Sequence, residues 1–311
     1  MGGWSSDSPK SYNWSKKPSV TKKSAKAYAQ DDKRVYEGDA AKGGAPVGRE
    51  IQTDEAFVNV IMVDQTGSMR EEPERFFKKA PALYEESNAI LQGYTLDELE
   101  KMAQPIPNKL SVSFFAIGDA YTDAYPLQVT DFEKKDGLVK AINSIRPEGN
   151  GGGQGMESYE LAAYYANNHC KTPNCQKPLC VIFGDETFYD KLMKQHVKKY
   201  IGDDIPNNLS SFSILEQLKQ RFDTYVLQPE LSYSKEEYKR IHEKWRKVMG
   251  VEKVMVLDSV ERAVDCIIGL NGVSSNNWNN AKEMLERRQR TDQVNEVIET
   301  LHPTLSAKNL K

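Results

Sequence analysis

The sequence predicts an α/β fold: a doubly wound, mostly parallel sheet with helices on both faces and one short antiparallel edge strand. Apolar runs of five to eight residues, rich in β-branched side chains, recur along 57–257. Runs of this kind are typical of strands buried on both faces of a parallel sheet. Helical stretches separate the runs as far as residue 270, and this alternation favours a sheet with helices on both sides.

The elements can be placed in order along the chain. Buried strands are expected at 57–63, 110–117, 179–183, 222–227 and 251–257. A shorter strand in PLQVTDF, 126–132, follows the second so closely that we expect a hairpin, and hence the antiparallel edge. Helices are expected from near Pro81 to 92, and then at 137–145, 159–169, 189–200, 213–220, 235–249 and 260–270. Pro81 would stand in the first turn of its helix, and Ser158 would cap the helix that follows it.

We expect one domain with two extensions. Residues 1–50 are rich in Ser, Lys, Gly and Asn and lack aliphatic periodicity, which predicts a flexible basic tail. The α/β domain follows at 51–272. In 273–311, the polar linker SSNNWNN precedes a single stretch of helical spacing, AKEMLERRQRTDQVNEVIETL, which we expect to pack on the domain or on a partner.

Composition excludes several classes of protein. The 311 residues carry a net charge of −3, so nucleic acid is not favoured as a partner, although residues 1–50 hold ten Lys and Arg against six Asp and Glu. No apolar run approaches the roughly 18 residues of a membrane helix, and the N-terminus lacks the apolar core of a signal peptide. We therefore expect a cytoplasmic protein, although MGGWSS does fit the short pattern for N-myristoylation.

The cysteines and histidines give little sign of a metal site. Cys170, Cys175 and Cys180 lie in HCKTPNCQKPLC, and Cys266 stands apart. Zinc sites usually space paired cysteines more tightly and supply a second pair, so free thiols are the favoured interpretation. A zinc knuckle, or a redox pair of Cys170 and Cys175, is the alternative. The four histidines are dispersed, and no phosphate-binding glycine motif follows a strand.

The strand 57–63 runs directly into a loop with three oxygen donors. These are Asp64, Thr66 and Ser68, in the segment DQTGSM. A carboxylate and two hydroxyls at alternate positions suit a hard divalent cation. The alternative is an ordinary strand-to-helix turn that Asp64 and Thr66 cap.

Two further loops offer oxygen donors. The glycine-rich GNGGGQGMES contains Gln154 and Glu157, and Asp185 follows the strand 179–183 after Gly184, with Glu186 beside it. Loops at the carboxyl ends of neighbouring central strands converge on one crevice in a doubly wound sheet. Because the donors are oxygens rather than nitrogen or sulfur, the sequence predicts Mg²⁺, with Mn²⁺ or Ca²⁺ as alternatives.

DQTGSM resembles the D-x-[ST]-x-S metal motif of von Willebrand factor A domains. The glycine-rich loop before a helix, the aspartate after the next central strand and the order of elements over 57–270 are also similar to that family. The resemblance implies that Asp64, Thr66 and Ser68 hold the cation directly or through water, and that Asp185 acts from the third loop. It further implies a protein partner whose carboxylate completes the coordination, and, in intracellular members, the assembly of complexes.

One position departs from the family pattern. The second loop of a von Willebrand factor A domain usually supplies a threonine, as in GGGT, where this chain has Gln154. A neutral amide oxygen implies weaker metal binding. Glu157 either substitutes for the threonine or is a carboxylate at a helix N-terminus with no metal role.

A second resemblance points to catalysis. DQTGS is similar to the DKTGT of haloacid dehalogenase-type phosphatases and phosphotransferases, in which the aspartate, here Asp64, is the nucleophile. GDETFYD, 184–190, fits the magnesium-binding GD-x4-D of that family. Against this, the family's second aspartate is Thr66 here, its lysine has only Lys177 as a candidate, and the glycine-rich loop is left without a role. We therefore favour a non-enzymatic, cation-dependent protein-binding module.

Overall fold

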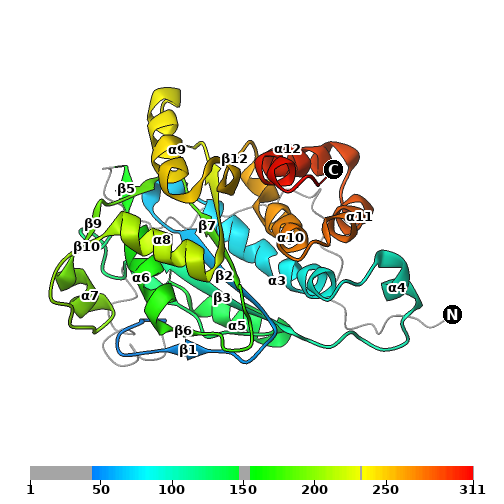
Figure 1. Cartoon of the computed structure of the whole chain (residues 1–311), viewed down its shortest axis with the longest axis horizontal. Helices are drawn as coiled ribbons and strands as arrows, with labels where there is room; N and C mark the ends of the chain where they lie inside the picture. Colours follow the sequence, from blue (N-terminus) through cyan, green and yellow to red (C-terminus); the bar gives the residue numbers. More distant parts are fainter. Residues whose placement is uncertain (1–43, 147–154, 232, 311) are drawn as a thin grey trace, which may run out of the picture.

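The computed structural model describes residues 44–146, 155–231 and 233–310 (Figure 1). The central sheet consists of β2 (Phe57–Asp64), β3 (Leu110–Ile117), β4 (Leu127–Val129), β7 (Leu179–Phe183), β11 (Asp223–Pro229) and β12 (Val254–Leu257). These strands lie in the order β12-β11-β7-β2-β3-β4, and all neighbours are parallel except β3 and β4. The predicted doubly wound α/β fold is thus confirmed, including its antiparallel edge strand.

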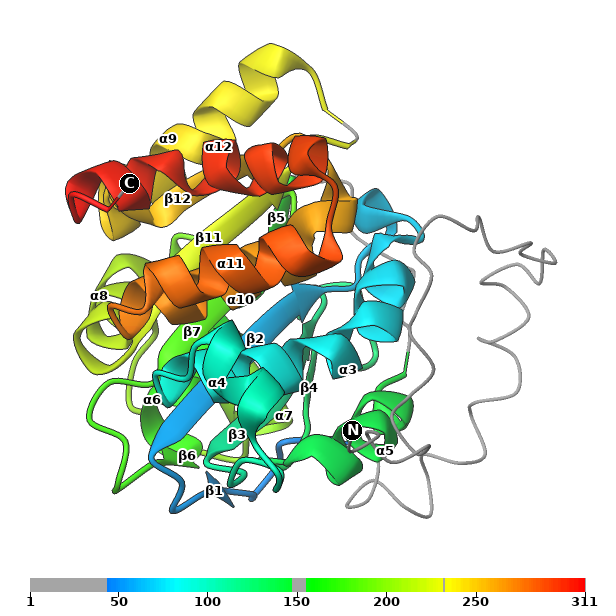
Figure 2. The same cartoon turned by 90° about the vertical axis from the view of Figure 1, so that its right-hand side faces the viewer.

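Helices cover both faces of this sheet (Figures 1 and 2). One face is covered by α3 (Glu72–Leu91), α5 (Lys135–Ser144), α10 (Ala263–Ser274), α11 (Trp278–Arg288) and α12 (Thr291–Ala307). The other is covered by α6 (Tyr159–His169), α7 (Lys194–Tyr200), α8 (Ser211–Arg221) and α9 (Lys235–Met249). The short α4 (Leu96–Lys101) contacts α11.

The central strand β2 contributes to the hydrophobic cores on both faces. Ile61 and Val63 belong to the core under α3 and α10, whereas Val60 and Met62 belong to the core under α6 and α8. Side chains alternate along a strand, so burial on both faces requires an apolar residue at each position. From β2 the chain continues to β3 on one side and reaches β7 on the other. The strand order therefore reverses at β2, where open α/β sheets bind ligands.

Short ladders and turns complete the described part of the chain. β1 (Ile51–Gln52) pairs with β6 (Cys170–Lys171), β5 (Met156–Glu157) with β8 (Thr187–Phe188), and β9 (Lys191–Leu192) with β10 (Leu209–Ser210). The 3-10 turns are η1 (Gly67–Met69), η2 (Val251–Lys253) and η3 (Val260–Arg262). Because β8 and β9 precede α7, this helix begins later than the predicted position near 189. Two-residue strands carry too little periodicity to be recognised in a sequence.

The start of α3 differs from the prediction. The helix begins at Glu72 and runs through position 81, rather than starting near Pro81. Pro73 lies in its first turn, where the missing N–H costs no helical hydrogen bond. Phe76, Ala80 and Leu83 follow at helical spacing and are buried against the sheet, which stabilises the helix across the second proline.

The predicted single C-terminal helix is wrong. Its residues belong to two helices, α11 and α12, because the main chain is extended at Arg290, whose N–H donates to the Gln293 side chain at 3.1 Å. Trp278, Leu285 and Leu301 are buried in the same hydrophobic core as α10. The C-terminal segment therefore forms part of the domain core instead of an appendage on it.

The domain also begins before the predicted boundary at residue 51. The Gly48 N–H donates to the Ile201 carbonyl at 2.8 Å, and the Arg49 guanidinium donates to the Val129 carbonyl at 2.9 Å and pairs with Asp131 at 2.6 Å. Residues 1–43 of the predicted tail, including MGGWSS, lie outside the described residues. No helix in the described ranges is long and apolar enough to cross a membrane.

Candidate metal centre

Asp64, the last residue of β2, lies at the centre of the candidate site. It is completely buried, and its Oδ1 accepts hydrogen bonds from the Thr66 N–H at 2.8 Å and the Thr66 hydroxyl at 2.6 Å. Its Oδ2 accepts a hydrogen bond of 2.5 Å from the hydroxyl of Tyr159, the first residue of α6. The local turn and a helix from across the sheet thus fix the orientation of the carboxylate.

The hydroxyls of the first loop connect it to the third. Thr66 Oγ1 and Ser68 Oγ lie 3.1 Å apart, and Ser68 Oγ donates to Asp185 Oδ1 at 2.8 Å. Asp185 follows β7, the neighbour of β2, and is completely buried. Its Oδ2 has no hydrogen-bond partner. The fold therefore brings together four of the predicted ligands, Asp64, Thr66, Ser68 and Asp185.

Gly184 makes this close approach of β2, β7 and α6 sterically feasible. A Cβ at this position would lie 2.0 Å from Tyr159 Oη and 2.8 Å from Asp64 Cβ. Both distances are shorter than van der Waals contacts allow. The glycine before Asp185 is therefore needed for the Tyr159–Asp64 hydrogen bond.

The hydrogen bonds that the structure describes do not join the other two predicted ligands, Gln154 and Glu157, to this group. Gln154 lies outside the described residues. Glu157, on β5, is 1% exposed, and apart from a contact with the Glu186 carboxyl neither of its carboxylate oxygens has a hydrogen-bond partner. Glu186 is 2% exposed, and the Tyr233 hydroxyl donates to its Oε1 while Oε2 has no partner. It stays a prediction that Glu157 or Gln154 helps to hold the cation at Asp64, Thr66, Ser68 and Asp185.

Burial and mutual repulsion make the carboxyls of this centre weak acids. Burial raises the pKa of Asp64 to about 6, against the opposing hydrogen bonds from Thr66 and Tyr159. Burial and the neighbouring Asp64 charge raise the pKa of Asp185 to about 8. Burial and the charges of Asp64 and Glu186 raise the pKa of Glu157 to about 12. The centre therefore gains stability from added positive charge, as protons or as a cation.

The donor chemistry fits a hard divalent ion. Carboxylate and hydroxyl oxygens are ligands of Mg²⁺, Mn²⁺ and Ca²⁺, and the unpartnered Asp185 Oδ2 is a buried acceptor without a donor. In the part of the chain that the structure describes, no three His, Cys, Asp or Glu side chains are grouped so as to hold one metal ion. A cation here would therefore depend on the hydroxyls of Thr66 and Ser68.

Sequence patterns did not reveal every residue of the centre. The sequence marks Tyr159 only as the start of a helix, yet its ring packs against Trp245 at 5.3 Å and its hydroxyl donates to Asp64. Tyr233 lies 47 residues from the Glu186 that it contacts. Neither tyrosine belongs to a motif with fixed spacing. Gly184 was the one visible signal, as the residue between a buried strand and a carboxylate.

The structure separates the residues that the phosphatase alternative requires. Lys177 precedes β7 and so lies at the amino end of the parallel strands, whereas Asp64 lies at their carboxyl end. Asp190, the last residue of GDETFYD, is exposed and pairs with Lys244 on α9 at 2.8 Å. The candidate lysine is thus in no position to assist chemistry at Asp64.

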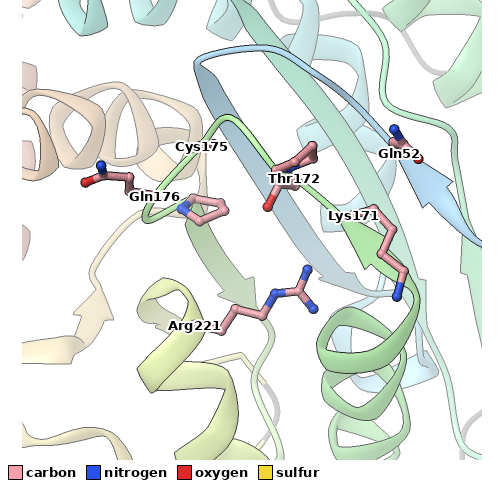
Figure 3. Close-up of a pocket in the computed structure, with 8 residues that line it drawn as sticks. Gln52, Lys171, Thr172, Cys175, Gln176 and Arg221 are labelled. Carbon is pink, nitrogen blue, oxygen red and sulfur yellow. The ribbon is translucent and has the colours of Figure 1, made fainter.

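A pocket of about 480 Å³ lies at the opposite, amino end of β7 and β11 (Figure 3). Arg221 reaches into it from α8 and donates to the Ala166, Asn167 and Cys170 carbonyls, and Lys171 donates to the Asn168 carbonyl at 3.0 Å. These cations satisfy main-chain carbonyls at the end of α6, which is a structural role.

The cysteines near this pocket are free thiols, as the favoured interpretation predicts. Cys170 and Cys180 are buried and Cys175 is half-buried. Burial raises the pKa of all three thiols, to about 12 for Cys170. Such thiols are poor nucleophiles and poor metal ligands.

No protein-family model matches the chain, and no curated protein sequence matches it. Several solved structures are similar to it. The pilus adhesin SpaC from Lactobacillus rhamnosus GG has 10% identity and a TM-score of 0.49, over 76% of this chain and 31% of that protein. Proximal thread matrix protein 1 from the mussel byssus, with a zinc-occupied MIDAS motif, has 13% identity and a TM-score of 0.39, over 71% and 48%. A von Willebrand factor type A structure from Catenulispora acidiphila has 13% identity and a TM-score of 0.37, over 71% and 43%.

This chain thus spans less than half the length of each of the three proteins. All three TM-scores lie below 0.5, so the fold is assigned from the strand order and pairing of the chain itself. The solved structures that the chain is similar to include a von Willebrand factor type A protein, the family that the DQTGSM motif resembles.

Proposed function

We propose that this chain is a protein-binding module that works through a divalent cation. Asp64, Thr66, Ser68 and Asp185 would hold the ion, with Mg²⁺ as the expected metal and Mn²⁺ or Ca²⁺ as alternatives. When bound, the cation supplies a positive centre with an open coordination position, which a carboxylate of a partner protein would fill. The module would serve as a scaffold or adaptor inside the cell.

One observation carries the proposal. Two loops that are distant in sequence meet through the 2.8 Å hydrogen bond from Ser68 to Asp185, and Asp185 Oδ2 is left buried without a donor. Buried polar atoms normally have a partner, and an ion is one that would satisfy this oxygen. Because the described side chains that meet there carry hydroxyls and carboxylates, a hard cation is the matching class of ligand.

The surroundings of Asp64 favour binding over catalysis. A nucleophilic carboxylate needs an oxygen that can reach a substrate. Here Oδ1 already accepts two hydrogen bonds from Thr66 and Oδ2 accepts one from Tyr159, and the side chain is completely buried. These contacts suit a residue that orients a cation or its water.

The thiols support the intracellular part of the proposal. Cys170, Cys175, Cys180 and Cys266 are all unpaired. Proteins of oxidising compartments commonly use their cysteines in disulfides, whereas reducing compartments keep them as thiols.

Calorimetric titration with Mg²⁺ and Mn²⁺ tests the cation site. Ser68→Ala and Asp185→Asn should each weaken binding by about tenfold or more, because each removes an oxygen donor from the ion. Ser213→Ala, an exposed serine on α8, is the matched control and should bind as the wild type does. Wild-type affinity in both site variants would show that the ion, if any, binds elsewhere.

The same proteins distinguish binding from catalysis. With Mn²⁺ bound, acetate should enter the open position and lower the water relaxivity of the Mn²⁺ complex in the wild type. Magnesium-dependent hydrolysis of p-nitrophenyl phosphate that disappears in Asp64→Ala would instead establish the phosphoaspartyl enzyme.

A further inference from the structure

A second pair of buried carboxylates lies beside the candidate metal centre. Glu157 is 1% exposed and Glu186 is 2% exposed. Apart from the contact between the two carboxyl groups themselves, three of their four oxygens, both of Glu157 and Oε2 of Glu186, have no hydrogen-bond partner. Fully buried polar atoms without partners are rare in folded proteins, and a bound ion is one kind of partner that satisfies them.

The backbone holds the two carboxylates toward each other. β5 pairs in parallel with β8, and Glu157 stands opposite Phe188 in this ladder. Glu186 is two residues before Phe188, so Glu157 and Glu186 are diagonal neighbours on one side of the ladder. The strand β5, which carries Glu157, and the residue that directly precedes β8, Glu186, thus bring both acids to the same side of the ladder.

Two aromatic side chains also hold Glu186 in place by hydrogen bonds. The Tyr233 hydroxyl donates to Oε1, and Trp245 Nε1 donates to the Glu186 main-chain carbonyl at 2.9 Å. Oε2 is therefore the oxygen that remains available to a ligand. Asp185, in contrast, is tied to Ser68 on the first loop. The consecutive acids Asp185 and Glu186 thus contact different parts of the chain: Asp185 contacts the first loop, and Glu186 contacts Tyr233 and Trp245.

We propose that Glu157 and Glu186 form a second cation site, separate from the site at Asp64, Thr66, Ser68 and Asp185. Its ligand would be a hard divalent cation such as Mn²⁺ or Ca²⁺, held by the two carboxylates, with water or main-chain oxygens in the remaining positions. Charge is compatible with a second ion, because one divalent cation would offset only two of the four negative charges that Asp64, Asp185, Glu157 and Glu186 carry once metal has displaced their protons. The proposal does not depend on capture of a partner protein.

The number of Mn²⁺ ions bound per chain tests whether Glu157 and Glu186 form a second cation site. Equilibrium dialysis of the full chain at neutral pH, with free Mn²⁺ measured by electron paramagnetic resonance, should give two ions per wild-type chain. Glu157→Gln and Glu186→Gln should each give one, because glutamine keeps the shape of the side chain and removes its charge. Glu160→Gln, an equally buried glutamate on α6, is the matched control and should keep two.

Ser68→Ala separates this site from the first one. If the second site exists, the Ser68→Ala variant should still bind one ion. The double variant with Ser68→Ala and Glu157→Gln should bind none. A single ion in the wild type that only Ser68→Ala removes would overturn the second site and leave the proposed function intact. Two ions in Glu157→Gln would also overturn it, since a proton shared by the two carboxyls would then explain their burial. Two ions in Ser68→Ala would overturn the proposed function instead.

Discussion

At the scale of single residues, the centre depends on how closely the main chain at Gly184 approaches Asp64 and Tyr159. A Cβ there would stand 2.0 Å from Tyr159 Oη. Gly184→Ala should therefore lower the free energy of unfolding by about 1–3 kcal/mol, the usual cost of overpacking a core. Urea denaturation followed by circular dichroism measures this change.

Tyr159→Phe provides the control for that prediction. It removes the oxygen that the new methyl group would meet first, so part of the stability lost in Gly184→Ala should return in the double variant. The recovery should be incomplete, because the Cβ would still lie 2.8 Å from Asp64 Cβ. Equal and additive losses would show that the methyl group clashes elsewhere.

The buried carboxyls also predict how stability depends on pH without metal. In EDTA, the protein should become more stable as the pH falls from about 8.5 to about 6.5. The pKa of Asp185 is raised to about 8, so its contribution is present at low pH and is lost as the pH rises through that value. Glu160, whose pKa burial raises to about 8, acts in the same direction. Burial lowers the pKa of His242 to about 4, so this histidine destabilises the fold only below about pH 6.5.

Thermal unfolding at a series of pH values checks this slope. Asp185→Asn should reduce it by about a third, leaving the parts due to Glu160 and to Glu157, since the pKa of about 12 keeps Glu157 protonated in the folded protein across this range. Saturating Mn²⁺ should reverse the trend, because the cation competes with protons for the same oxygens. Stability that rises with pH in EDTA would contradict the burial of these acids.

The centre was predictable only where local spacing determined it. Asp64 ends β2, Thr66 and Ser68 lie in the turn after it, and Asp185 follows the neighbouring strand β7, so strand order alone brings them together. Tyr159 begins the helix α6, and its ring packs against Trp245 from α9. Such contacts arise from tertiary structure and leave no periodic trace in the sequence.

At the scale of elements, boundaries were predicted well where apolar and polar segments change sharply. β3 and β7 have the predicted bounds, as does α9, which begins with the capping box of Ser234 and Glu237. The predictions were wrong where burial outweighs local preference, as in α3, which continues through a proline. Between α11 and α12 the helical spacing is uninterrupted, so only the structure shows the break at Arg290.

Arg288 explains how α11 is held in place. Its guanidinium pairs with Glu86 on α3 at 2.8 Å and with Asp265 on α10 at 2.6 Å, and Asp265 is only 4% exposed. Arg288→Met should lower the free energy of unfolding by about 2 kcal/mol or more, because it leaves buried carboxylates with less charge compensation. Urea denaturation is again the measurement.

Arg287 is the matched control on the same helix. Its side chain is 56% exposed and lies 3.4 Å from Glu100, an exposed pair of the kind that contributes little. Arg287→Met should change stability by less than about 0.5 kcal/mol. If both variants lost similar amounts of stability, α11 would be sensitive to the loss of any arginine. The ion pairs of Arg288 with Glu86 and Asp265 would then have no special role.

At the scale of the whole molecule, the two hydrophobic cores separated by the sheet are completed by different parts of the chain. The core under α6, α8 and α9 uses the middle of the sequence, whereas the core under α3 and α10 is closed by α11 and α12. A Cβ on Gly269 of α10 would lie 2.6 Å from Leu301 Cδ1, which shows how closely α12 packs. The C-terminal helices should therefore unfold together with the sheet.

Leu301→Ala tests this coupling. Removing a fully buried leucine should cost about 2–4 kcal/mol of global stability, and the neighbouring exposed residue provides a control, since His302→Ala should cost almost nothing. In Leu301→Ala, the urea midpoint for loss of Mn²⁺ binding and the midpoint for loss of the helical circular dichroism signal should fall together. The reason is that the cation site lies on the same sheet that α12 covers. If α12 were an appendage, Leu301→Ala would melt one helix early while Mn²⁺ binding kept its wild-type midpoint. Coincident shifts would establish that the centre and the C-terminal helices belong to one cooperative unit.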